Sequence, residues 1–239
     1  MNIIYGKNPV INTIQKNESI IKRVILLKNS AIDNNVLEII KQKKLKVDYL
    51  EKSDFQNLFN KKVTHQNILA EVKDFQFSDF KSLLGEQNKK NTILILDRIQ
   101  DPNNFGAIIR SAVLFGVNGI IIPEHNQAGV TPAVMKASAG TAYTIPIVKV
   151  PNLSHAISLL KEKNYWIYCS YLGDESLDIT KTDFTKNCVI ILGNEMEGVA
   201  NKIMKKSDYL FKIKTNNDID SLNVSVAAGI ILFNRYNNE

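Results

Sequence analysis

Short apolar runs that end abruptly in polar residues recur along the second part of this 239-residue chain. The run at 92–96 is typical: it is rich in Ile and Leu, and it is too short for an ordinary helix. Buried strands that alternate with helices build a mostly parallel sheet that is covered on both faces. The alternation therefore predicts an α/β fold. The expected strands lie at 92–96, 119–122, 145–148, 165–170, 189–192 and 209–213, and the expected helices at 107–115, 132–137 and 152–163.

The first 74 residues show the same alternation in a smaller unit. A helical pattern at 8–16 precedes the first expected strand at 23–27. Helical patterns at 36–40, capped by Asp33, and at 54–60 lie between this strand and those at 46–49 and 68–72. We expect a mostly parallel sheet here as well. The polar segment 75–91 has the composition of a linker. The sequence thus predicts a domain at 1–74, a linker at 75–91 and a larger domain at 92–239.

Positive charge is concentrated in the first domain. Residues 1–74 carry 13 Lys and Arg against 8 Asp and Glu, whereas the remaining residues carry 17 against 16. Such a bias favours a domain that binds a polyanion, most simply a nucleic acid; a lysine-rich solvated surface is the alternative.

The sequence gives little sign of a membrane, secreted or metal-binding protein. Apolar runs fall short of the roughly 18 residues that span a bilayer, and the amino terminus lacks the regions of a signal peptide, so we expect a cytoplasmic protein. Cys169 and Cys188 lie in strand-like runs and are expected to be buried thiols. The three histidines are scattered without zinc-ligand spacing, so we expect no metal.

Three polar segments lie where predicted strands end. The first, Asp-Pro-Asn-Asn-Phe-Gly at 101–106, follows the strand at 92–96 and precedes a helix that carries Arg110. Strand, turn and helix mark the edge where open α/β sheets bind ligands. Long helical side chains lean toward the helix start, so Arg110 could reach the turn that holds Asn104. An exposed arginine beside a simple turn fits this segment nearly as well.

The second and third segments are Gly-Asn-Glu-Met-Glu-Gly at 193–198 and Ser-Leu-Asn-Val-Ser-Val-Ala at 221–227. Two glycines at a strand end permit a close backbone approach to a ligand, yet neither a P-loop nor a dinucleotide fingerprint is present. The third segment opens a helix that Asp220 or Ser221 can cap. Its apolar positions recur at helical spacing and mark one face, formed by Leu222, Val226, Ile230 and Phe233.

Taken together and in this order, the three segments resemble the motifs of the SpoU family of RNA ribose 2′-O-methyltransferases, within the SPOUT class. The resemblance covers 92–239. The resemblance extends to the amino-terminal part of the chain. Two segments there, Ile-Tyr-Gly-Lys-Asn-Pro-Val at 4–10 and His-Gln-Asn-Ile at 65–68, are similar to segments of the family's substrate-binding domain. That domain is typical of members that methylate a guanosine of large-subunit ribosomal RNA.

The resemblance implies a small α/β/α domain followed by a SPOUT domain with a parallel sheet and a deep trefoil knot. It implies S-adenosylmethionine as cofactor, RNA as substrate and a homodimer in which two subunits complete each site. The residues that it assigns to cofactor binding are Gly193, Ile213, Leu222 and Thr141. Those that it assigns to the active site are Asn104, Arg110, Glu195, Ser221 and Asn223.

The chemistry leaves the role of Arg110 open. By resemblance, Arg110 either takes part in deprotonating the ribose hydroxyl or holds a phosphate through paired hydrogen bonds. A guanidinium is a very weak proton acceptor at neutral pH, so we favour the positioning role. Lys214 and Asn217 stand where the family usually has proline and glycine. The alternatives are methylation of transfer RNA, or a protein of the same fold that binds RNA without catalysis.

Overall fold

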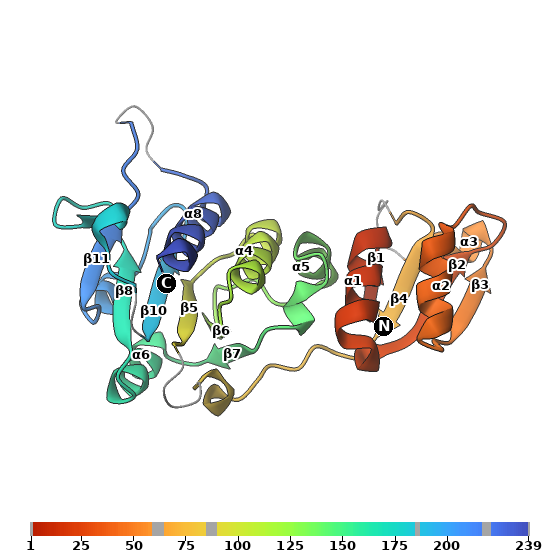
Figure 1. The fold of residues 1–239 in the computed structure, drawn as a ribbon, viewed down its shortest axis with the longest axis horizontal. Coiled ribbons are helices and arrows are strands. Elements are labelled where there is room, and N and C mark those ends of the chain that lie inside the picture. The colour runs from red at the N-terminus through yellow and green to blue at the C-terminus, as the bar shows by residue number, and fades with distance from the viewer. Residues whose placement is uncertain (1, 59–64, 85–89, 185–186, 217–220, 239) are drawn as a thin grey trace.

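The computed structural model describes residues 2–58, 65–84, 90–184, 187–216 and 221–238. Within these ranges the chain forms two sheets, and each is the centre of one domain (Figure 1). The smaller domain is built from the amino-terminal residues. The larger domain holds every helix and strand from β5 onward.

The described strands of the small domain form a four-stranded sheet in the order β1-β4-β2-β3. Their bounds are β1 (Asn2–Tyr5), β2 (Ile21–Leu27), β3 (Val47–Leu50) and β4 (Ile68–Val72). Only β2 and β3 are parallel, because β4 lies antiparallel between β1 and β2. The expectation of a mostly parallel sheet was therefore wrong for this domain. Strand β1 was not predicted. It pairs with β4, which runs antiparallel to both β1 and β2.

Helices cover both faces of the small sheet. Phe55 of α3 packs with Ile25 and Leu69 on one face, whereas α1 and α2 share a cluster with the other face. The carboxylate of Asp33 caps α2 by accepting from Asn35 N at 2.9 Å, as predicted. The helices are α1 (Lys7–Asn17), α2 (Asn34–Gln42) and α3 (Lys52–Asn57).

In the larger domain, the seven described strands pair in parallel in the order β7-β6-β5-β10-β8-β11-β9, which confirms the predicted parallel sheet. The strands are β5 (Thr92–Asp97), β6 (Gly119–Pro123), β7 (Ile147–Val150), β8 (Trp166–Ser170), β9 (Leu177–Asp178), β10 (Cys188–Gly193) and β11 (Tyr209–Lys212). Cys169 and Cys188 are buried in the sheet as free thiols. The connection from β11 to the last helix includes residues outside the described ranges, so the trefoil knot stays a prediction.

The two faces of the large sheet carry different helices. Helices α4, α5 and α8 contribute to the cluster on one face, and α6 and α7 to the cluster on the other. Figure 1 shows α4 and α8 next to each other in front of β5 and β10. The bounds are α4 (Pro102–Leu114), α5 (Pro132–Ala137), α6 (Leu153–Glu162), α7 (Asn201–Met204) and α8 (Val224–Asn237).

Helix α4 begins earlier than its apolar pattern indicates. We expected residues 101–106 to form a turn, but the helix starts at Pro102, with Asp101 as its cap. The Asp101 carboxylate accepts from Asn103 N at 3.0 Å, and proline is well suited to a first helical position because no amide is needed there. Asn104 therefore lies in the first helical turn.

Helix α8 buries a different face from its apolar stripe. Its buried residues are Val224, Ala228, Ile231, Leu232 and Arg235. In contrast, Val226, Ile230 and Phe233 are between 38% and 54% exposed. The stripe that marked an apolar face in the sequence is thus largely exposed, although the Phe233 ring packs against Phe115.

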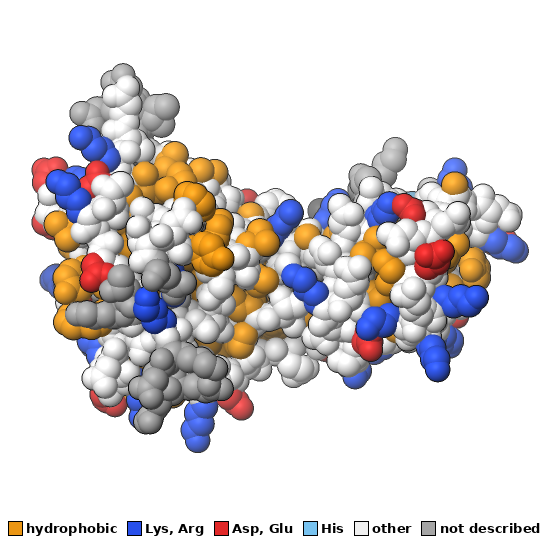
Figure 2. All heavy atoms as spheres, in the orientation of Figure 1, with side chains coloured by type: hydrophobic (Ala, Val, Ile, Leu, Met, Phe, Trp, Pro, Cys, Tyr) orange, Lys and Arg blue, Asp and Glu red, His pale blue; other side chains and the backbone are white. Residues whose placement is uncertain are grey.

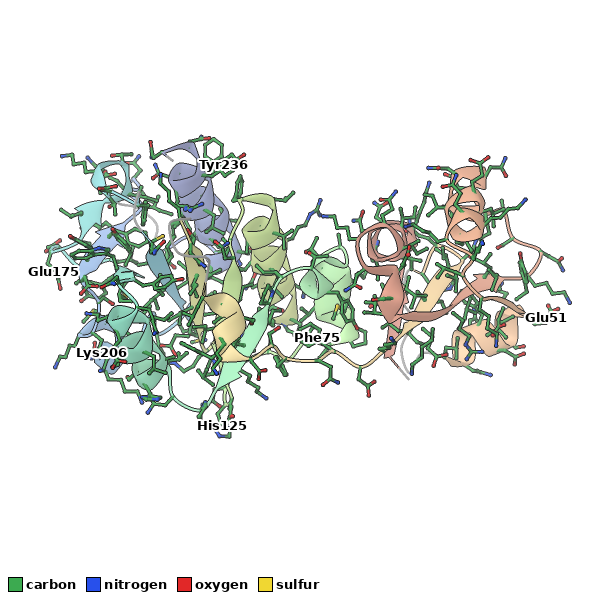
Figure 3. The ribbon with its side chains drawn as sticks, turned by 60° about the horizontal axis from the view of Figure 1, so that its bottom comes forward. Glu51, Phe75, His125, Glu175, Lys206 and Tyr236 are labelled. Atoms are coloured by element: carbon green, nitrogen blue, oxygen red, sulfur yellow. The ribbon has the colours of Figure 1, made fainter. Side chains whose placement is uncertain are left out.

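The two domains contact each other through α1. Asn12 Nδ2 donates to Ala139 O at 3.1 Å, and Asn17 Nδ2 donates to Tyr143 O at 3.2 Å. Phe75, labelled in Figure 3, lies where the chain passes from the small domain to the large one, and its ring packs against Tyr143. The described part of segment 75–91 therefore packs against the large domain.

No helix within the described ranges is both long and apolar enough to span a membrane.

Candidate functional site

The candidate site lies at the carboxyl edge of the large sheet. Strands β8, β10 and β11 end there, and α8 begins beside them. Between these ends is a pocket of about 440 Å³. It has both apolar and polar walls. The lining includes Ser170, Tyr171, Leu172, Leu192, Gly193, Asn194, Glu195, Met196, Glu197, Gly198, Val199, Asn201, Ile213, Thr215, Ser221, Leu222, Val224 and Ala227.

The segment after β10, residues 193–198, folds back on itself and forms one wall of the pocket. Asn194 pairs with Gly198 in an isolated bridge, and Gly198 N donates to Asn194 O at 2.8 Å. A Cβ atom at Gly193 would lie 2.2 Å from both Gly198 C and Val199 N. Because both of those atoms belong to the backbone, only glycine fits at position 193.

Three predicted active-site residues form a hydrogen-bonded chain next to this wall. Asn104 Nδ2 donates to the Glu195 carboxylate, and Asn223 Nδ2 donates to Asn104 Oδ1 at 3.0 Å. Residues that lie far apart in the sequence are thus linked across α4, the segment after β10 and α8.

The start of α8 fixes the orientation of the Asn223 amide. Its Oδ1 accepts from Ser225 N at 2.9 Å and from Ser225 Oγ at 2.6 Å, so its amino group is free to face Asn104. Asn223 is therefore the cap of α8. Ser221 was wrong as the predicted cap, since it lies two residues before the cap; the other predicted cap, Asp220, lies outside the described residues.

Asp97 and Arg98 hold the segment after β10 from the side of β5. Asp97 is buried, and its Oδ2 accepts from Ala200 N at 2.8 Å. The Arg98 guanidinium pairs with the carboxylates of Asp97 and Glu197. Burial lowers the pKa of Arg98, but these two carboxylates outweigh it and raise the pKa above its ordinary value.

The nine predicted site residues are not all brought together. Gly193, Glu195, Ile213, Ser221 and Leu222 line the pocket, and Asn104 and Asn223 join it through the hydrogen-bonded chain. Arg110 is exposed on α4, outside the pocket lining, and makes no hydrogen bond or ion pair with any residue that the structure describes.

Thr141 lies elsewhere, in a short buried turn after α5, where its hydroxyl donates to Ser138 O at 2.7 Å. This turn faces α1 of the small domain, and Thr141 is not part of the pocket lining. The geometry therefore gives no support to a cofactor contact by Thr141, and we leave it out of the proposed site.

Sequence reasoning missed two parts of the site. Tyr171 and Leu172 follow the end of β8, so the same strand-end rule that found the other segments could have found them. Asp97 and Arg98 stand at the end of β5, where the same rule applies, but their contacts with Glu197 and Ala200 could not be predicted because these partners are distant in the sequence.

The pocket suits a ligand with an apolar and a polar part. Its wall contains backbone groups around Gly193 next to the apolar side chains of Ile213 and Leu222, and carboxylates lie at its mouth. Cys169 is not a candidate nucleophile, since burial raises the pKa of its thiol to about 12. No group of three potential metal ligands occurs within the described ranges.

Comparison with known protein families gives two matches that together cover most of the chain. Residues 91–233 match the SpoU rRNA Methylase family. Residues 3–78 match the family described as RNA 2′-O ribose methyltransferase substrate binding.

Similar curated proteins span nearly the same length. A 23S rRNA (guanosine-2′-O-)-methyltransferase of Coxiella burnetii is 34% identical over 236 residues, which covers 96% of this chain and 93% of that protein. A protein of Mycoplasma genitalium named as an uncharacterized tRNA/rRNA methyltransferase is 39% identical over 203 residues, 83% of each chain.

The fold is shared with solved structures. The SpoU methyltransferase AviRb from Streptomyces viridochromogenes, in complex with the cofactor AdoMet, superposes with a TM-score of 0.80 at 19% identity, over 98% of this chain and 89% of that one. An AdoMet-bound rRNA methyltransferase from Sinorhizobium meliloti gives a TM-score of 0.79 at 22% identity, covering 99% and 87%.

Proposed function

This chain belongs to the SpoU rRNA methylase family, and we propose that it transfers a methyl group from S-adenosylmethionine to a ribose 2′-hydroxyl of RNA. The observation that carries the proposal is the hydrogen-bonded chain of Asn104, Glu195 and Asn223 beside the pocket. These groups are suited to orienting a substrate, because their donors and acceptors are fixed before it binds.

We assign the pocket to the cofactor. Backbone groups at Gly193, Ile213 and Leu222 would bind the adenosine end, since all three line the pocket and the missing side chain of Gly193 lets the 193–198 segment fold back to form its wall. Bound S-adenosylmethionine supplies a methyl group activated by a positively charged sulfonium. The protein's own residues then have to align the ribose hydroxyl and hold the adjacent phosphate.

Arg110 fits the phosphate-holding role. Its guanidinium is exposed and makes no hydrogen bond or ion pair within the described part of the chain, so its donors are available to an RNA phosphate. Asn104, Ser221 and Asn223 would orient the ribose. Glu195 would fix the position of Asn104, whose amino group already donates to it.

We propose that two copies of the chain associate through an apolar patch on α4 and α8, formed by Leu114, Val226, Ile230, Phe233 and Tyr236. All five are exposed. Figure 2 shows hydrophobic side chains gathered where Figure 1 places α8 and α4, and Figure 3 labels Tyr236 near the end of α8. Contiguous apolar surface on a soluble protein marks an interaction site.

The position of Arg110 connects this patch with catalysis. Arg110 lies four residues before Leu114, and both are exposed on α4, so they lie on one side of the helix. Association through the patch would place the Arg110 guanidinium at the junction between two copies. This arrangement would explain why Arg110 does not line the pocket of its own chain.

Phe233→Glu is expected to convert the protein to a monomer. A charge in place of an aromatic side chain at the centre of an interface weakens association by about 30-fold or more. Light scattering coupled to size exclusion measures the mass directly. Tyr49→Glu, at another exposed aromatic residue on β3, is the matched control and should leave the mass unchanged. Equal masses for wild type and Phe233→Glu would contradict the assignment of this patch.

For the substrate, we propose large-subunit ribosomal RNA, and a guanosine within it. The net charge of +5 in residues 1–74 and the match of residues 3–78 to a substrate-binding family support an RNA contact by the small domain. The Coxiella burnetii relative, which carries both parts, is named for a 23S rRNA guanosine.

Transfer of labelled methyl to unmodified large-subunit ribosomal RNA and, in parallel, to transfer RNA tests the substrate. We expect label in ribosomal RNA alone. Label in transfer RNA alone would overturn the substrate and keep the chemistry. Binding of RNA without transfer to either would favour a protein that has kept the fold and lost catalysis.

A further inference from the structure

Arg98 occupies a backbone conformation that few residues other than glycine adopt. Its φ is +64°, and it directly follows β5 at the carboxyl edge of the sheet. A left-handed conformation is unfavourable for a side chain with a Cβ atom. Such a conformation persists where surrounding contacts compensate for it, and these positions cluster at functional sites.

The side chain of Arg98 makes those contacts with the pocket wall. Its Nη1 donates to the Glu197 carboxylate, and its Nη2 donates to Gly198 O at 3.3 Å. Its Nε donates to Asp97 Oδ1 at 3.2 Å, which holds the guanidinium plane against the end of β5.

The backbone of Arg98 supports the same wall. Its carbonyl oxygen accepts from Asn194 Nδ2 at 3.0 Å, and the Asn194 Oδ1 in turn accepts from Met196 N at 2.8 Å. The left-handed turn at Arg98 thus places a carbonyl at one end of the 193–198 segment and a guanidinium at the other. Glu195, the partner of Asn104, lies between these two anchoring points.

We propose that Arg98 is a positioning residue for the cofactor pocket: it holds the 193–198 segment in its binding conformation through Glu197 and Gly198. This inference rests on the cofactor pocket proposed above. Arg98 does not line the pocket, so it acts through the segment and not by direct contact with the ligand.

The ion pair contributes only part of this effect. Glu197 is 67% exposed, so solvent and salt screen its attraction to Arg98, whose side chain is 26% exposed. The Arg98 guanidinium also donates a hydrogen bond to the backbone oxygen of Gly198, which an isolated surface ion pair lacks. Loss of the side chain should therefore weaken the restraint by a moderate factor, while the backbone contact to Asn194 remains.

Arg98→Gly separates positioning from folding. The substitution removes the guanidinium, and glycine adopts the left-handed conformation without steric strain. The variant should therefore unfold at the wild-type temperature or above it. We expect S-adenosylmethionine to bind about three- to tenfold more weakly, as measured by calorimetry. Without cofactor, amides at 194–198 should exchange hydrogen faster than in wild type by a similar factor.

Lys44→Gly is the matched control. Like Arg98, Lys44 is a cation with a left-handed backbone, at φ +51°, but it is exposed and lies in the small domain. This variant should leave both the cofactor affinity and the exchange at 194–198 unchanged. Adding Glu197→Gln to Arg98→Gly should cost little further affinity, because the two residues act through one contact.

The outcomes separate a failure of the role proposed for Arg98 from a failure of the proposed cofactor pocket. If wild type binds the cofactor, and Arg98→Gly has the same affinity and the same hydrogen exchange at 194–198, the role of Arg98 is overturned and the pocket assignment is kept. A drop in unfolding temperature that accounts for the weaker binding would also overturn it, by reducing Arg98 to a structural role. Absence of cofactor binding by wild type would overturn the pocket and this inference together.

Discussion

Gly193→Ala is expected to lower the affinity for S-adenosylmethionine by about 100-fold. The added Cβ would lie 2.2 Å from two backbone atoms of the Gly198–Val199 peptide. Flexible side chains can yield to such an overlap, but here the backbone itself has to move. The movement would displace the wall that holds Glu195 and narrow the pocket.

Calorimetric titration with the cofactor measures this effect, and RNA binding by the small domain should persist. Gly129→Ala is the matched control, because a Cβ at Gly129 meets no heavy atom within 4 Å. An affinity of Gly193→Ala within twofold of wild type would show that the cofactor does not use this wall.

Arg110→Ala is expected to slow methyl transfer by about 10²- to 10³-fold, as for the loss of a preorganised charged donor in an active site. Cofactor affinity and unfolding temperature should stay at wild-type values, since Arg110 is exposed and has no hydrogen bond or ion pair within the described residues. Single-turnover transfer of labelled methyl to RNA measures the rate.

Two further variants sharpen this prediction. Arg110→Lys keeps the charge but loses the paired donors, so it should recover only part of the rate. Lys202→Ala removes an exposed cation from α7, which packs on the opposite face of the sheet, and should leave the rate unchanged. Transfer by Arg110→Ala within tenfold of wild type would exclude Arg110 from the chemistry.

Local signals in the sequence predicted many elements well. The helix at 132–137 and the strand at 68–72 agree with α5 and β4 to the residue. In α5, a proline in the first turn and Gly140 shortly after the end act within a few residues of each other, so they can be read without tertiary information.

Properties that depend on distant partners could not be predicted in this way. The direction of β4 depends on its pairing with β1, in which Asn2 lies opposite Val72, 70 residues later in the chain. The stripe of Val226, Ile230 and Phe233 was a correct apolar face, but periodicity cannot tell a core from an interface. The folded chain shows that most of this face is exposed, and its role as an interface stays a proposal.

In the candidate site, too, local sequence signals could be predicted and contacts between distant residues could not. The strand-end rule indicated the segments that hold Asn104, Glu195 and Asn223, and the structure links these residues by hydrogen bonds. Arg98 also follows a strand end, but its φ and its pairing with Glu197 are properties of the folded chain and could not be predicted. Its role followed only from the geometry.

Ribose methylation is tested by the chemical position of the transferred methyl group. Large-subunit ribosomal RNA labelled by the protein would be hydrolysed in alkali, which requires a free 2′-hydroxyl next to each broken phosphodiester bond. We predict that the label is recovered in alkali-stable dinucleotides whose first nucleoside is 2′-O-methylguanosine. Label recovered in mononucleotides, as methylated bases, would contradict ribose methylation and with it the assignment of the site.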